Sequence, residues 1–111
     1  MGDNMLSLSG SDEIVLLAVM RLGPNAYGVT IRKAVTEATG QEPSIGAIYT
    51  ALERLEEKGF VSSRQGEPTP ERGGRAKRYF EITGAGAQAL TEAERVRALL
   101  RGQLRPAGGA V

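Results

Sequence analysis

The spacing of the apolar residues changes twice along the chain, and this order restricts the folds that it can adopt. Three segments place apolar side chains three or four residues apart, as on one face of a helix: 9–22, 27–39 and 44–59. Two shorter segments have the residue pattern of strands: 60–64 and 77–83. Helical spacing returns from Ala85 to Leu104. The sequence therefore predicts three helices, a β-hairpin and a final helix.

Polar and small residues mark where these helices are expected to begin. Ser9 or Ser11, Ser44 and Thr83 precede helical segments, and their hydroxyl oxygens can accept a hydrogen bond from the first free amides. The apolar spacing also predicts which side chains are buried. In the first helix these are Ile14, Leu17, Ala18 and Leu22, with Val15, Leu16, Val19 and Met20 widening the apolar stripe. In the second they are Val29, Ile31, Ala34, Val35 and Ala38, and in the third Ile45, Ile48, Leu52 and Leu55.

The composition argues against catalysis and against a metal site. The chain contains no Cys and no His, which removes thiolate nucleophiles, the commonest metal ligands and the commonest general base. The segment GAGAQA at 84–89 follows a strand and opens a helix, like a dinucleotide-binding loop. Too little chain follows it to build the second parallel strand of that fold. We therefore expect no catalytic residue, no metal site and no cofactor, and do not expect an enzyme.

The length and the hydropathy pattern favour one domain in the cytoplasm. A chain of 111 residues is the size of a single domain. Residues 1–8 lack the basic cluster and apolar run of a signal peptide. The longest apolar run, 14–20, is too short to span a bilayer. We expect no association with membranes.

Basic residues concentrate around the predicted hairpin loop, although the net charge of the chain is only +1. Segment 64–78 holds two anions, Glu67 and Glu71, against five cations: Arg64, Arg72, Arg75, Lys77 and Arg78. Arg and Lys on a Gly-rich loop can neutralise phosphates of nucleic acid. The alternative is a solvated surface loop whose charge only maintains solubility.

The order of the elements indicates a winged helix-turn-helix fold, mainly α with a small β-hairpin. The DNA-binding domain is expected over 1–83, a C-terminal dimerisation helix over 84–105 and a disordered tail over 106–111. The third helix of such a fold enters the major groove by its N-terminal end. The residues expected to contact DNA are Tyr27, Lys33, Ser44, Gly46, Ala47, Tyr49, Thr50 and Arg54 on the helices, and Arg72, Arg75, Lys77 and Arg78 on the hairpin.

The last helix is expected to pair with a second copy of the chain, because the core of so small a domain cannot cover its whole apolar stripe. The residues predicted at this dimer interface are Leu90, Ala93, Val96, Arg97, Leu100 and Leu104. The alternative is that the helix packs back onto the first helix of its own chain.

Three segments resemble the PadR family of bacterial transcriptional regulators. They read LLAVMRLGPNAYGVTIRKAV at 16–35, PSIGAIYTALERLEEKGFV at 43–61 and RAKRYFEITGAGAQAL at 75–90. The resemblance implies a dimer of winged helix-turn-helix subunits that usually represses an adjacent operon. It also implies that Tyr49, Gly46 and Tyr27, with the basic wing, take part in binding DNA. Some members of the family bind flat ligands between Trp residues, which this chain lacks.

Together these observations predict a sequence-specific regulator that binds double-stranded DNA as a homodimer and represses transcription from a palindromic operator. Two alternatives are a winged-helix module that binds proteins and a sensor whose DNA binding is gated by an unknown small-molecule effector.

Overall fold

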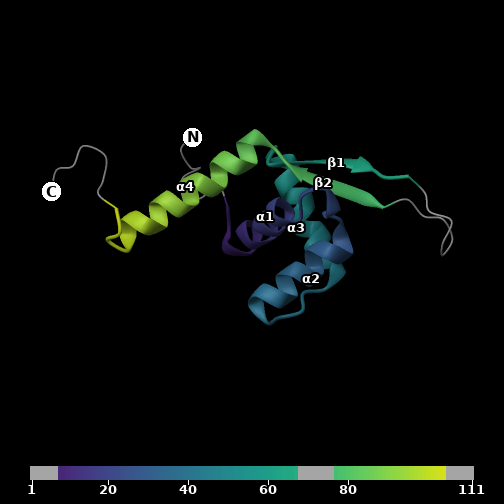
Figure 1. Ribbon diagram of the computed structural model, residues 1–111, viewed down its shortest axis with the longest axis horizontal. Helices are drawn as coiled ribbons and strands as arrows, with labels where there is room; N and C mark the ends of the chain where they lie inside the picture. The colour runs from purple at the N-terminus through teal and green to yellow at the C-terminus, as the bar shows by residue number, and fades with distance from the viewer. Residues whose placement is uncertain (1–7, 68–76, 105–111) are drawn as a thin grey trace.

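A computed structural model describes residues 8–67 and 77–104 of the chain. Three helices form a compact body, and a hairpin and a fourth helix extend from it in opposite directions (Figure 1). The elements are α1 (Gly10–Leu22), the short 3₁₀ helix η2 (Gly23–Asn25), α2 (Gly28–Thr39), α3 (Ile45–Glu57), β1 (Val61–Gln65), β2 (Arg78–Ile82) and α4 (Gly84–Leu100). This confirms the predicted mainly helical fold with a small β-hairpin.

Three of the helices begin at a hydroxyl residue that caps them, as the sequence predicts. The hydroxyl oxygen of Ser9 accepts a hydrogen bond from the Asp12 amide at 3.2 Å. Ser44 accepts one from the Ala47 amide at 3.0 Å. Thr83 accepts one from the amide of Gly86, also at 3.0 Å. Each hydroxyl satisfies a backbone donor that has no partner inside its helix, which fixes where the helix begins.

The hairpin pairs β1 with β2 in an antiparallel register that runs from Val61 opposite Ile82 to Gln65 opposite Arg78. Val61 and Phe80 point into the core, whereas most other side chains of the two strands are exposed or half-buried. The hairpin thus covers one side of the helical body with one face and presents the other to solvent.

The core lies where α1, α2 and α3 meet the hairpin. Its fully buried side chains include Leu16, Ile31, Ile48, Leu52 and Leu55. Leu90 of α4 also belongs to this core. Among the described residues, no helix is both long enough and apolar enough to cross a membrane.

The predicted burial is wrong for some apolar residues on all three helices. Ile45 is 42% exposed and Val29 is 64% exposed. Both lie in the first turn of a helix, before the first buried apolar side chains, Ile31 in α2 and Ile48 in α3. Ile14 and Leu17 are also exposed, because within the wide apolar stripe of α1 the buried face is formed by Val15, Leu16, Ala18 and Val19.

The fully buried contacts of helix α4 with the body lie in its first turns. Gly86 and Leu90 are its buried residues, whereas Leu100 at the other end is 84% exposed. Figure 1 shows the helix running outward from the end of β2, away from the other helices. The apolar stripe of α4 therefore loses the cover of its own chain toward Leu100.

Candidate nucleic-acid interface

The first turns of α3 present small and hydroxylated residues to solvent. Ser44, Gly46, Ala47 and Thr50 are all exposed. A side chain added at Gly46 would meet only open space, with the nearest atom, Ser44 Oγ, 3.9 Å away. Another molecule could therefore come close to the backbone of α3 here. The structure brings these four predicted contact residues together on one accessible surface.

Tyr49 is half-buried rather than free in solvent. Its ring centroid lies 6.3 Å from that of Phe80 in β2. Its hydroxyl end lies against Gly28, where a Cβ atom would come within 2.6 Å of Tyr49 Oη. Tyr49 thus packs α3 against the first turn of α2, and only part of its ring remains accessible for contact with a ligand.

The loop end of the hairpin, together with Tyr27, carries a cation–aromatic stack in which two cations flank two aromatic rings. Tyr27 and Tyr79 meet edge to face with their ring centroids 5.4 Å apart. The guanidinium of Arg64 lies 4.8 Å from the Tyr79 centroid, and the ammonium of Lys77 lies 4.7 Å from that of Tyr27. Cation–π contacts of this kind hold charged groups over ring faces. Two cations are thereby held near the start of α2.

Arg64 and Tyr79 are not among the residues that the sequence predicts to contact DNA. Both lie in strands, where alternation places them on one face, and the register pairs them directly across the hairpin. A basic residue paired across a hairpin with an aromatic one is the signal that could have identified them.

Arg78 connects the hairpin to the end of α3. Its Nη2 atom donates to Glu56 Oε1 at 2.8 Å and to Ser63 Oγ at 3.1 Å. Ser63 in turn donates to Glu56 Oε2 at 2.8 Å. Arg78 also lies 5.2 Å from the ring centroid of Phe80. This predicted phosphate contact is thus already occupied within the chain, although its side chain is still partly exposed.

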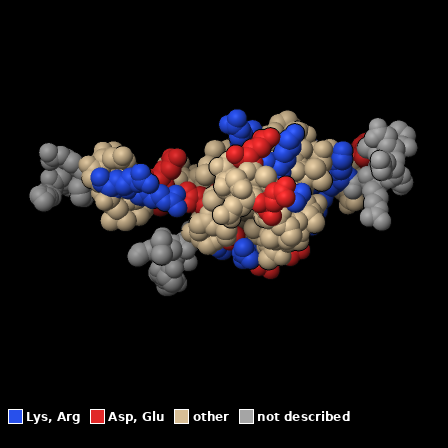
Figure 2. Space-filling model, turned by 90° about the horizontal axis from the view of Figure 1, so that it is seen from below, with Lys and Arg blue, Asp and Glu red and all other residues tan. Residues whose placement is uncertain are grey.

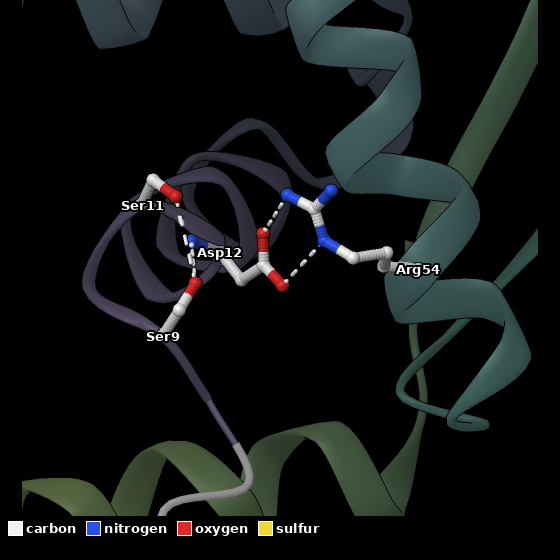
Figure 3. Close-up of polar contacts among 4 residues, drawn as sticks. All are labelled: Ser9, Ser11, Asp12 and Arg54. Atoms are coloured by element: carbon white, nitrogen blue, oxygen red, sulfur yellow. Dashed lines mark hydrogen bonds and ion pairs between the residues drawn. The ribbon is translucent and has the colours of Figure 1, made fainter.

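Arg54 points toward α1. Its Nη2 and Nε atoms donate to the two carboxylate oxygens of Asp12, at 2.7 and 3.1 Å (Figure 3). The hydrogen bond and the negative charge of Asp12 raise the pKa of Arg54 above its ordinary value. The structure thus places this predicted DNA contact in an ion pair between two helices.

The remaining predicted contacts lie on α2 or outside the described residues. Lys33 is exposed on α2. Its neighbour Arg32 donates to the carbonyl of Pro43 at 2.6 Å and so fixes the turn between α2 and α3. Arg72 and Arg75 lie in segment 68–76, which is outside the described residues, as is the predicted tail over 106–111.

The residues predicted at the dimer interface divide into two groups. Leu90 lies in the core of its own chain, and Arg97 makes an ion pair with Glu13 of α1. Ala93 and Val96 are half-buried, and Leu100 and Leu104 are exposed. Helix α4 thus follows the alternative of packing onto α1 as far as Arg97, whereas Leu100 and Leu104 are uncovered.

Basic side chains lie at both ends of the molecule. In the view of Figure 2, blue side chains gather on α4 at one end, and others lie toward the hairpin at the opposite end. α4 contributes Arg95 and Arg97, and Arg101 follows it directly. The start of α3 is linked to the basic residues of the hairpin through Tyr49, which packs against Gly28 next to Tyr27.

Comparison with known proteins agrees with this geometry. The model of the transcriptional regulator PadR-like family matches residues 16–92. The TA0346 protein from Thermoplasma acidophilum is 28% identical, with a TM-score of 0.64 over 80% of this chain and 84% of that one. A PadR family regulator from Eggerthella lenta is 25% identical, with a TM-score of 0.64 over 83% and 78% of the two chains.

A PadR family regulator from Clostridium difficile shares the fold at 22% identity, with a TM-score of 0.67 over 84% of this chain and 93% of that one. The search of curated proteins finds no match. The family match covers more than half of the chain and includes α2, α3 and the hairpin. The chain therefore belongs to the PadR-like family of transcriptional regulators.

Proposed function

We propose that the protein is a sequence-specific DNA-binding repressor that acts as a homodimer on a palindromic operator in the cytoplasm. The observation that carries the proposal is the exposed start of α3 beside the cation–aromatic stack of the hairpin. Small residues allow the helix to approach base edges, and neighbouring cations can neutralise the flanking phosphates. A protein-binding module would not need this combination.

The proposed contacts follow from where each side chain lies. Ser44, Gly46, Ala47 and Thr50 face the floor of the major groove, and helix N-terminal amides bind a phosphate. Tyr49 places its accessible edge beside them. Lys77, Arg64 and Lys33 contact phosphates, together with Arg72 and Arg75 of the hairpin loop, and Tyr27 supports Lys77.

The proposed dimer uses the half-buried and exposed apolar residues of α4 and of the segment that follows it: Ala93, Val96, Leu100 and Leu104. In this assignment residues 1–83 bind DNA and residues 84–105 form the dimerisation helix. A twofold dimer would place its two α3 helices about one DNA turn, ~34 Å, apart, which matches the spacing of palindromic half-sites.

The test is to select bound sequences from a random duplex pool at physiological salt. We expect a palindromic motif with half-sites one turn apart. Only unspecific, salt-labile binding would contradict the proposal and would favour a protein-binding module or a form that needs an effector.

The selected operator then allows the cationic contacts to be counted. Lys77→Ala should weaken binding to all sequences and reduce the slope of log affinity against log salt by about 0.9, the value for one lost phosphate contact. Arg21→Ala is the matched control, because Arg21 is exposed and lines a hollow between α1 and α2 that includes no residue of the hairpin. An unchanged slope in Lys77→Ala would remove Lys77 from the interface.

A further inference from the structure

Two consecutive acidic residues at the start of α1 are almost completely buried. Asp12 is 1% exposed and Glu13 is 4% exposed. Acidic residues in the first turn of a helix are ordinarily solvated, and they are seldom buried without a partner. Each of these two carboxylates meets an arginine from a different helix. Their burial therefore indicates that the contacts serve the arrangement of the helices.

The first contact joins α1 to α3. Asp12 receives two parallel hydrogen bonds from Arg54 (Figure 3), which is the geometry in which a guanidinium and a carboxylate match best. Arg54 lies on α3 several residues after the exposed first turn that we propose to enter DNA. If Arg54 turned to a DNA phosphate, the buried carboxylate of Asp12 would lose its partner.

The second contact joins α1 to α4. Glu13 pairs with Arg97, and the hydrogen bond and charge of Glu13 raise the pKa of Arg97. Successive residues of a helix point about 100° apart, so Asp12 and Glu13 face different neighbours. Figure 3 shows α4 passing below the start of α1, while α3 lies beside it. One turn of α1 is thus tied to both helices.

We infer that Asp12 and Glu13 form an ionic joint that sets the orientation of α3 relative to α4, and that Arg54 and Arg97 are positioning residues. Arg54 then supports DNA binding without contacting DNA. The inference rests on the proposed function, in which α3 reads the operator and α4 forms the dimer. It assigns to α1 the task of coupling those two helices.

If Arg54 instead contacts a DNA phosphate directly, the variant Asp12→Asn should change the operator affinity in the opposite direction. Removing the negative charge of Asp12 would release Arg54 toward DNA and reduce repulsion of phosphates, so affinity would rise or stay the same. If Arg54 is a positioning residue, Asp12→Asn loosens α3 and affinity falls. The side chain of Asn has the same size as that of Asp, so packing is retained.

The experiment compares Asp12→Asn, Arg54→Met and the double variant in the full chain, on the operator selected with the unaltered protein. We expect each single variant to lose about tenfold in operator affinity with an unchanged salt slope, and the double variant to lose no more than Arg54→Met. A gain in affinity in Asp12→Asn, or a slope reduced by about 0.9 in Arg54→Met, would overturn the inference.

The double variant Asp12→Asn/Arg54→Met keeps the test valid if one of the single variants unfolds. Arg54→Met alone leaves a buried unpaired charge, whereas replacing both partners by neutral residues is tolerated far better. Melting curves identify the folded variants. A folded Asp12→Asn/Arg54→Met protein with unaltered operator affinity would overturn the positioning of α3 by this pair.

The ion pair between Glu13 and Arg97 is tested by changing the spacing between the two operator half-sites. Glu13→Gln/Arg97→Met should still bind half-sites but should discriminate less, by about tenfold, against operators with one inserted base pair. Glu92→Gln is the matched control, because it breaks an exposed ion pair on α4, between Glu92 and Arg95. If Glu13→Gln/Arg97→Met discriminates against the inserted base pair as strongly as the unaltered protein does, the ionic joint is contradicted.

The proposed function and the ionic joint are contradicted by different results. If the unaltered protein selects no operator, the proposed function fails and the inference falls with it. If the unaltered protein selects an operator and the variants bind it equally well, only the inference is overturned.

Discussion

Tyr49 and Gly28 lie in such close contact that the position of the Tyr49 ring depends on the absence of a side chain at Gly28. The hydroxyl end of Tyr49 occupies the space in which any other residue at position 28 would place its Cβ atom. This contact sets how near α2 lies to α3, and with it how far the first turn of α3 stands out. A residue chosen from the sequence as a DNA contact is therefore also a packing residue.

Gly28→Ala should destabilise the fold, because the ring of Tyr49 has to move out of a well-packed site. We expect the free energy of unfolding to fall by about 1–3 kcal/mol. Gly46→Ala is the matched control in α3, where the added methyl group meets open space and should raise stability by about 0.5–1 kcal/mol. Denaturant titration of the two variants measures both effects.

Operator binding should separate the same two variants further. Gly46→Ala should be the more stable protein and yet bind its operator more weakly, since the methyl group lies on the proposed contact surface. Tighter binding by Gly46→Ala would show that the first turn of α3 does not approach DNA closely.

The sequence could predict the exposed part of the site but not its buried ion pairs. Ser44, Gly46 and Thr50 were predictable because cap chemistry and helical spacing fix their positions. Asp12 and Glu13 were predictable only as residues of a first helical turn, where solvated acids are the rule. Their partners lie far away in the sequence, at Arg54 and Arg97, and no local pattern links them.

Helix α4 and the hairpin are joined by a very close backbone contact. An ideal Cβ atom on Gly86 would come within 2.2 Å of the Phe60 carbonyl oxygen. That oxygen also accepts a hydrogen bond from the Thr83 amide at 3.0 Å, so it cannot easily move aside. The start of α4 is thereby set against the start of the hairpin.

Gly86→Ala should push α4 away from the hairpin, because backbone atoms leave the methyl group no room. We expect a loss of about 1–3 kcal/mol in the free energy of unfolding. Gly84→Ala, two residues earlier in the same helix, meets no atom within 4 Å and should not destabilise the protein. Thermal melts that gave equal values for both variants would argue against the close contact.

The elements themselves were predictable because their signals are local. Caps at Ser9, Ser44 and Thr83 gave the starts of helices, and alternation gave β2. The degree of burial was less predictable, since it depends on where helices cross. Ile45 continues the helical stripe of α3 but lies in its first turn, before the buried Ile48, and its apolar side chain remains exposed.

The assembly proposed for the protein depends on the far end of α4, where Leu100 is exposed. Leu100→Glu should weaken the dimer by tenfold or more, because a charge would have to be buried in an apolar interface, at a cost of roughly 1.4 kcal/mol or above. Sedimentation over a range of protein concentrations measures the dissociation constant.

Thr91→Glu is the control for that measurement, because Thr91 is exposed on α4 and lies outside the proposed interface. It should leave the dissociation constant unchanged. If Leu100→Glu also leaves it unchanged, the later turns of α4 are not the dimer interface.

The length of α4 makes its far end sensitive to small changes at its base. With 17 residues at ~1.5 Å each, α4 is a rod of ~25 Å. A tilt of ~10° about its first turn displaces the other end by ~4 Å, which exceeds the ~3.4 Å between successive base pairs. In the proposed dimer, a change in the tilt of α4 that is too small to alter the fold of either subunit would move one α3 helix off its half-site.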